Sequence, residues 1–227
     1  GSTLPGTLGI GHTRWATHGA PSDENSHPHT NADRTIAVVH NGIIENYADL
    51  KDKLKLKGYT FRSETDTEVL VQLIDYLHNG SHLPLLLAVE TALRSVIGAY
   101  AIAVIDKTNP HQIIAARKSS PLVVGIGDNE FFLASDATPI VEYTDKVVYL
   151  NDEEIAIINL DNGLEIVNLH NTKVTPEIKT INLELNRLEK GGYPHFMLKE
   201  IYEQPNCLSD CMCGRVSSES NSIKLSA

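Results

Sequence analysis

The sequence predicts a layered α/β fold, of the α+β kind with largely antiparallel sheets, on three observations. One strand pattern early in the chain is followed by helical patterns as far as Val96. Beyond Gly98 the chain changes to short β-rich runs that turn residues separate. Short strands joined by tight turns pair as antiparallel neighbours, and each amphipathic helix needs an apolar surface to cover.

The first two elements in chain order are a strand and a helix. Residues 36–40 have the apolar, β-branched composition of a buried strand. The helix is predicted over residues 46–58, where Asn46 can cap the N-terminus. Leu50 and Leu54 lie one turn apart and give this helix an apolar face.

Two further helices follow. The second runs from Thr65 to Gly80, because Thr65 and Glu68 have the spacing of a capping box. In a capping box each of the two side chains accepts a hydrogen bond from the other residue's backbone N–H. The third helix covers residues 84–96, and Pro84 suits its first helical position.

The second half of the chain reads as strands and then a linker. The predicted strands are Tyr100–Ile105, Gln112–Ala116, Leu122–Ile126, Phe131–Ala134, Val147–Leu150, Ile155–Ile158 and Leu164–Val167. From Thr172 to Gly192 the chain is polar and weakly patterned, which predicts a linker.

Composition excludes several classes of function. A chain of 227 residues with 41% hydrophobic and 21% charged residues is long enough for one globular domain with an extension. The formal charge of −10 argues against nucleic acid as a partner, because phosphate contacts rely on clustered Lys and Arg. The apolar runs are far shorter than the ~20 residues of a membrane span, and no signal peptide is visible. We therefore expect no membrane partner and, since the three cysteines form no disulfide framework, a cytoplasmic protein.

The residues that can carry chemistry gather in one run, GHTRWATHGAP at 11–21. Guanidinium, indole, hydroxyl and imidazole groups bounded by glycines and a proline are typical of a binding loop. Taken alone, Arg14 could equally form a surface salt bridge, and Trp15 could be a core or interface aromatic. Within this run an arginine suits a carboxylate ligand, because its planar fork can donate two parallel bonds.

Two other positions have a structural and a functional interpretation. Asn41-Gly42 is the strongest short signal for a hairpin turn, but the residues after it read as the entry to a helix. Asp66 opens the second helix, where the helix dipole favours a carboxylate whatever its function.

Together these motifs resemble the glutaminase domain of the glucosamine-6-phosphate synthases, a family of N-terminal-nucleophile (class II) amidotransferases. The resemblance rests on residues 11–21, Asn41-Gly42 and Ser63 to Glu68. It continues in order through Arg117 to Leu122, Ala134 to Asp136 and Lys199 to Pro205. It implies a four-layer αββα sandwich that hydrolyses glutamine to glutamate and ammonia. The ammonia would convert fructose 6-phosphate to glucosamine 6-phosphate for hexosamine biosynthesis.

The resemblance also implies roles in binding glutamine. Arg14 would hold the substrate α-carboxylate, with Thr17 and His18 lining the same loop. Trp15 would gate the path by which ammonia leaves, and Asp66 would bind the α-ammonium group.

For catalysis the resemblance implies an oxyanion hole made by the Asn41 side-chain amide and the Gly42 backbone N–H. A glycine suits this role because it leaves its amide accessible. His27 is expected to support the glutamine loop, while His12 and His40 are expected to be structural. The His27-Pro28-His29 spacing occurs in some metal sites, but no acidic residue has a matching ligand spacing, so we expect no metal and no cofactor.

The family's nucleophile and general base belong to one residue, an N-terminal cysteine with its free α-amine. Cys207, Cys211 and Cys213 cannot replace it, because none carries a free α-amine. We therefore expect residues 1–227 alone to be inactive and to lack an N-terminal segment of the domain. The alternative is a non-catalytic module that binds glutamine or serves assembly.

The expected domain organisation follows from the resemblance. Residues 1–192 would form the glutaminase domain, and residues 193–227 would be the interdomain linker and the start of a sugar-isomerase domain. The partners implied are glutamine, fructose 6-phosphate through the isomerase domain, and a second copy in a full-length homodimer.

Overall fold

The computed structural model describes residues 6–15, 17–181, 192–212, 216–217 and 222–223. The chain forms two compact units, Gly1–Ile181 and Asn182–Ala227. The predicted boundary at residue 192 stays a prediction, because residues 182–191 lie outside the described part of the chain.

A seven-stranded antiparallel sheet is the centre of the first unit. Its order is β1(His29–Thr30), β2(Ile36–Ile44), β3(Gly98–Asp106), β4(Asn109–Lys118), β8(Glu154–Asn159), β9(Gly163–Asn168) and β10(Lys173–Val174). The longest pairing joins β2 to β3 over nine positions, from Ile36 opposite Asp106 to Ile44 opposite Gly98. β1 pairs with β2 only at Ala37 and Val38, so most of β2 has no strand on its outer side within the described residues.

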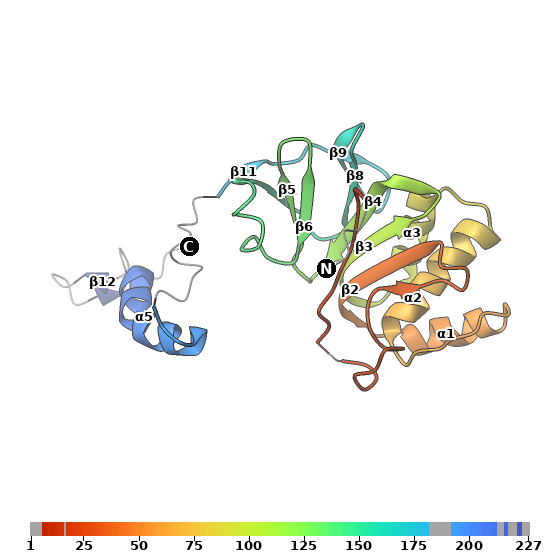
Figure 1. The fold of residues 1–227 in the computed structure, drawn as a ribbon, viewed down its shortest axis with the longest axis horizontal. Coiled ribbons are helices and arrows are strands. Elements are labelled where there is room, and N and C mark those ends of the chain that lie inside the picture. The colour runs from red at the N-terminus through yellow and green to blue at the C-terminus, as the bar shows by residue number, and fades with distance from the viewer. Residues whose placement is uncertain (1–5, 16, 182–191, 213–215, 218–221, 224–227) are drawn as a thin grey trace. The chain divides into compact units, whose positions relative to one another are not determined.

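Three helices cover one face of this sheet (Figure 1). They are α1(Tyr47–Lys55), α2(Asp66–Asp75) and α3(Leu85–Ser95), and a π-helical turn, Tyr76–Gly80, extends α2. α2 packs against β2, and its Val69, Leu70 and Ile74 are fully buried in a core that they share with Ile102 and Ile114 of the sheet. Buried apolar residues of α1 and α3, among them Leu50, Leu54 and Leu93, belong to the same core.

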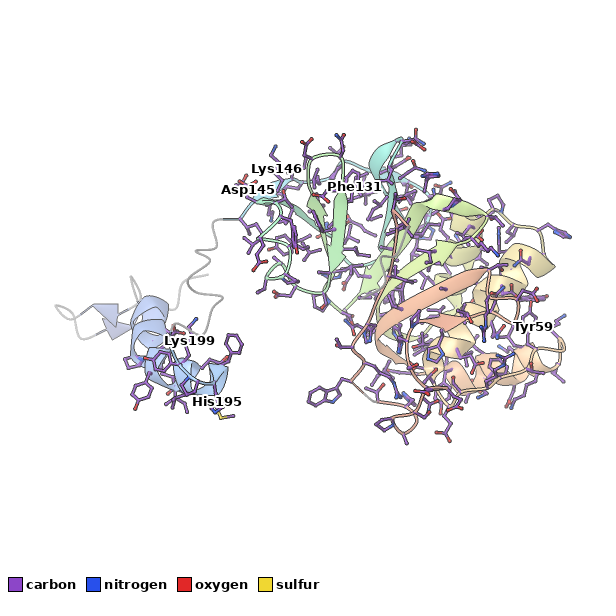
Figure 2. All side chains as sticks on the ribbon, viewed as in Figure 1. Tyr59, Phe131, Asp145, Lys146, His195 and Lys199 are labelled. Atoms are coloured by element: carbon purple, nitrogen blue, oxygen red, sulfur yellow. The ribbon has the colours of Figure 1, made fainter. Side chains whose placement is uncertain are left out.

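A second, four-stranded sheet packs on the other face. Its order is β11(Lys179–Thr180), β7(Lys146–Tyr149), β5(Val123–Ile126) and β6(Phe131–Ala134). Small alanines of the first sheet, Ala101, Ala115 and Ala156, meet Val124 and Val148 of the second. Figure 2 marks Tyr59 on the helical side of this unit and Phe131, Asp145 and Lys146 on the side of the second sheet.

These residues give the first unit three layers, helix on sheet on sheet, with antiparallel pairing throughout the named strands. The outer face of the second sheet packs against Ile140 in a turn and against Ile181. A fourth, helical layer is not formed by the described residues of this unit.

The strand predictions agree with the structure to within three residues at each end, except that the strand expected over residues 36–40 continues to Ile44. The linker prediction is wrong for its first half. Residues 172–192 were expected to be unpatterned, yet Lys173–Val174 pairs with β9 and Lys179–Thr180 pairs with β7. Two-residue strands carry no alternating pattern, and their pairing partners lie elsewhere in the chain. Sequence periodicity therefore has no means of detecting them.

Thr65 caps α2 as predicted, and its side-chain oxygen accepts from the Glu68 N–H at 3.2 Å. The reciprocal half of the capping box is absent. The Glu68 carboxylate accepts instead from the backbone N–H groups of Arg62, at 2.8 Å, and of Ser63, at 2.6 Å. This buried carboxylate therefore holds the loop that leads into the helix.

The second unit holds α5(Phe196–Met212) and the paired strands β12(Val216–Ser217) and β13(Ser222–Ile223). His195 and Lys199 lie at the start of α5 (Figure 2), and the Lys199 N–H donates to the His195 carbonyl at 3.2 Å. The residues from Lys199 to Pro205, expected as a joining segment, are thus helical, with Pro205 inside the helix. Among the helices of the described residues, none has the length and apolarity needed to cross a bilayer.

Two glycines allow β2 and β3 to approach closely at one end of their ladder. Gly42 has φ +125°, and a Cβ there would lie 2.1 Å from the Ala99 carbonyl oxygen. Gly98 has φ +131°, and a Cβ there would lie 2.1 Å from the Ile43 carbonyl oxygen. Both clashes are with backbone, so no side-chain movement relieves them.

We expect Gly98→Ala to lower the free energy of unfolding by more than ~2 kcal/mol, because the strands would have to separate. Gly163→Ala is the matched control, since Gly163 has φ +81° but open space around its Cβ position. That variant should lose only about 1 kcal/mol from backbone strain. Urea unfolding of both variants measures the difference, and equal losses would show that the β2–β3 contact is not tight.

Candidate active site

A cavity of about 280 Å³ lies beside the outer edge of β2. Four parts of the chain line it: the N-terminal segment from His12 to His18 within its described residues, His27, the end of β2, and the start of α2 with Thr65 before it. All eight site residues predicted from the sequence line this one cavity. They are Arg14, Trp15, Thr17, His18, His27, Asn41, Gly42 and Asp66.

The end of β2 presents backbone donors to this side. Successive residues of a strand direct their N–H groups to alternate sides. The Ile44 N–H points away from β3, because it donates to Asp66 Oδ2 at 2.8 Å, while the Glu45 N–H donates toward Ile97 on the β3 side. Gly42, two residues before Ile44, therefore directs its N–H to the outer edge of the sheet. Asn41-Gly42 is thus part of a strand rather than a hairpin turn.

Asp66 is the first residue of α2 and is 3% exposed. Its Oδ2 holds the Ile44 N–H, and its Oδ1 lies 3.9 Å from His18 Nδ1. This carboxylate therefore ties α2 to the end of β2 with one oxygen and leaves the other toward the cavity. The position at the helix N-terminus favours its negative charge.

Arg14 shapes the loop that it belongs to. Its backbone has φ 51°, in the left-handed region that disfavours a residue with a side chain. Its guanidinium donates to the carbonyls of His18 at 2.7 Å, Gly19 at 2.9 Å and Ala20 at 3.4 Å. These bonds use three of the five N–H donors of an arginine, so two are left for a ligand.

Asn41 faces His12. Asn41 Oδ1 lies 2.6 Å from His12 Nε2, and His12 Nδ1 lies 2.8 Å from the Arg14 backbone N. His12, which is expected to be a structural histidine, lines the cavity and contacts two of the predicted site residues. Its position in the same motif as Arg14 was the signal that it belongs there.

A buried cluster of imidazoles and hydroxyls supports the cavity from beneath. The Thr67 hydroxyl lies 3.1 Å from His27 Nε2 and 3.0 Å from His40 Nδ1, and Thr65 Oγ1 lies 3.0 Å from His29 Nε2. Thr65, Thr67 and His40 line the cavity but were not predicted as site residues. The sequence offers little indication that the two threonines belong to the site, because threonines at the start of a helix are usually explained by capping.

Burial keeps these imidazoles neutral. Loss of solvation, with smaller contributions from His29, His12, His40 and Arg14, lowers the pKa of His27 from 6.5 to about 3. Burial also lowers the pKa of His29 and of His40, and the neighbouring Asp66 opposes the shift at His40. Across the described residues, no group of three or more His, Cys, Asp or Glu side chains is arranged to hold a metal ion.

The rim of the cavity is open. Trp15 is 91% exposed, and Thr17 is exposed as well. His18 is half-buried, and its ring meets the Tyr47 ring edge-on with centroids 5.0 Å apart. The cavity therefore has a firm floor of buried polar groups and a mouth formed by one loop.

Comparison with known families decides the identity of this arrangement. The family model of the glutamine amidotransferase domain matches residues 12–142, which hold every residue of the cavity. The chain belongs to the glutamine amidotransferase family. The match spans the lining loop, β2 and α2 of this amidotransferase domain, and it also includes β5 and β6 of the second sheet.

Two relatives of this amidotransferase domain are named glutamine–fructose-6-phosphate aminotransferase (isomerizing). The protein of Bacteroides thetaiotaomicron is 64% identical over 99% of this chain, and that of Chlorobaculum tepidum is 52% identical over 98%. The chain spans 36% of the length of each of these two relatives.

Solved structures show the same fold at lower identity. Glutamine phosphoribosylpyrophosphate amidotransferase of Bacillus subtilis aligns with a TM-score of 0.57 and 27% identity over 70% of this chain and 34% of its own. A structure described as the allosteric regulatory enzyme of purine biosynthesis aligns with a TM-score of 0.58 and 29% identity, with the same coverage. The antiparallel α+β architecture of the amidotransferase domain is thus shared with a second kind of amidotransferase.

We expect the amidotransferase domain to lose stability on acidification below about pH 6.5, because the unfolded chain then binds more protons than the folded one. For His27 the window runs from 6.5 down to about 3. His27→Gln retains a partner for Thr67 and does not titrate, so its unfolding midpoint should depend less steeply on pH between 7 and 5. Urea unfolding at several pH values measures both slopes, and identical slopes would contradict the neutral state of His27.

Proposed function

We propose that this chain is the glutaminase part of a glutamine–fructose-6-phosphate aminotransferase. In this function it hydrolyses glutamine to glutamate and ammonia, and the ammonia converts fructose 6-phosphate to glucosamine 6-phosphate in hexosamine biosynthesis. The observation that carries the proposal is that Arg14, Asp66, Asn41 and Gly42 line one cavity of about 280 Å³. The names of the relatives support the choice of sugar substrate.

In this proposal the two charged residues hold the amino-acid end of glutamine. Arg14 binds the α-carboxylate with the donors that its loop carbonyls leave available. Asp66 binds the α-ammonium group through Oδ1, because Oδ2 is held by the Ile44 N–H. A zwitterionic ligand thus finds opposite charges on two separate segments, which selects free glutamine over a peptide side chain.

The side-chain amide of glutamine then lies at the edge of β2. Attack on its carbonyl places negative charge on the oxygen, and donors aimed at that oxygen stabilise the tetrahedral intermediate. The Asn41 amide and the Gly42 N–H are such donors, and both belong to a strand that a paired neighbour holds rigid. Thr17, His18 and His27 complete the wall around the substrate, and Trp15 gates the path by which ammonia leaves.

The reaction also needs a nucleophile. No cysteine lines the cavity within the described residues. We propose that the N-terminal cysteine of the mature full-length enzyme attacks the amide carbonyl and that its own α-amine accepts the thiol proton. We further propose the four-layer αββα sandwich, a homodimer and a cytoplasmic location for that full-length enzyme.

Arg14→Ala in the full-length enzyme should raise the KM for glutamine by about 10²-fold, since a charge-assisted pair with the substrate is lost. Arg62→Ala is the control, because Arg62 is exposed and its side chain is outside the cavity. Steady-state glutaminase assays measure both variants. If Arg14→Ala has the same KM for glutamine as the unsubstituted enzyme, Arg14 does not bind the substrate carboxylate.

Asn41→Ala should lower kcat for glutamine hydrolysis by about 10²–10³-fold, which is the usual loss for one oxyanion donor. Asn109→Ala, on the exposed end of β4, is the matched control. Binding of glutamine to Asn41→Ala, measured by calorimetry, should persist. A full-length protein that binds glutamine but shows no glutamine turnover before any substitution would instead be a non-catalytic glutamine-binding module.

A further inference from the structure

The contacts of His12 leave its ring one protonation pattern. The Arg14 backbone N–H lies 2.8 Å from His12 Nδ1 and can only donate, so Nδ1 carries no proton. The neutral ring then carries its proton on Nε2, which lies 2.6 Å from Asn41 Oδ1. His12 therefore donates a hydrogen bond to the Asn41 side-chain carbonyl.

This bond decides which way the Asn41 amide faces. The two orientations of an asparagine amide have nearly the same shape, and only hydrogen bonds distinguish them. Because the His12 proton holds Oδ1, the NH2 group is turned away from His12. The flipped amide would set two donors against each other, at the cost of the hydrogen bond. Asn41 Nδ2 makes no hydrogen bond within the described residues, so it is available to a ligand in the cavity.

The His12 ring is itself held in place. The His27 ring packs on it, with centroids 4.6 Å apart and an angle of 31° between the planes. His27 is in turn fixed by the Thr67 hydroxyl at 3.1 Å. The ring is thus a rigid link between the first turn of α2, the loop at Arg14 and the end of β2.

We propose that His12 is a positioning residue that couples the glutamine-binding loop to the oxyanion donor. One nitrogen holds the Arg14 backbone in its left-handed conformation, and the other aims the Asn41 amide. The inference rests on the proposed glutaminase function, in which the Asn41 amide stabilises the oxyanion. His12 takes no proton from the substrate, because both of its nitrogens are already engaged.

Two amide substitutions separate the two nitrogens. In His12→Asn the side-chain oxygen takes the place of Nδ1 and accepts from Arg14, but the side chain is too short to reach Asn41. In His12→Gln the amide nitrogen takes the place of Nε2 and donates to Asn41, while the acceptor for Arg14 is lost. In the full-length enzyme, His12→Asn should lower kcat for glutamine hydrolysis by about 10-fold or more and leave KM nearly unchanged. His12→Gln should keep kcat within about threefold and raise the KM for glutamine.

A double-mutant cycle tests whether His12 acts through Asn41. In the Asn41→Ala background, His12→Asn should cause no further loss of kcat, because the group that His12 positions is gone. Additive losses would overturn the inference, and so would a normal kcat for His12→Asn alone. A general loss of structure would lower kcat for His12→Gln as well. A kcat retained in His12→Gln but lost in His12→Asn therefore distinguishes positioning from folding.

The same data separate this inference from the proposed function. A normal kcat for Asn41→Ala would remove the oxyanion role of Asn41, and an unsubstituted full-length enzyme that does not hydrolyse glutamine would overturn the proposed function. A defective Asn41→Ala beside a normal His12→Asn would overturn the positioning role alone. If His12→Asn fails to fold, His12→Gln decides: retained kcat with raised KM supports the inference, and a kcat as low as that of Asn41→Ala overturns it.

Discussion

The hydrogen bond from the Ile44 N–H to Asp66 is the interaction on which the site depends. It joins the end of a central strand to the first residue of a helix, at 2.8 Å and with the carboxylate almost fully buried. Because β1 reaches only as far as Val38, no strand covers this part of β2 within the described residues, and Asp66 takes the donor that a strand would have paired. A strand edge with free donors thus lies beside a helix N-terminus whose dipole favours the negative charge of Asp66.

A second constraint comes from the polar floor under the cavity. His27, His29, His40, Thr65 and Thr67 lie close enough for hydrogen bonds, and they exclude water from one side of the site. Such a cluster is stable only when each ring is neutral and its protons are distributed without conflict. The loop that carries Arg14 therefore rests on side chains that contact one another at hydrogen-bond distance. Rigid support of this kind lets a short loop hold a left-handed residue in place.

Much of this arrangement could be predicted from the sequence, and the failures have physical reasons. Thr65 predicted the start of α2, because capping is a local interaction. The composition of the β-rich runs predicted their strands. Family resemblance, rather than periodicity, brought Arg14, Asn41 and Asp66 together as one site. The strand through Asn41-Gly42, the short strands β10 and β11, and the partners of Glu68 depend on contacts across the chain. The donor role of His12 depends on two such contacts at once.

The order of strands in the first sheet has a consequence for synthesis on the ribosome. Every residue of the cavity precedes β3, and β3 is the strand that pairs with β2 over its whole length. Three helices separate the two strands along the chain, so the nascent chain must extend past Ala101 before the end of β2 gains its β3 partner. Since domains emerge from their N-terminal end first, the cavity forms late relative to the translation of its own residues. The segments around Arg14 and Asp66 are therefore synthesised before the site can form. Its formation requires the pairing of β2 with β3, a strand that contributes no residue to the lining of the cavity.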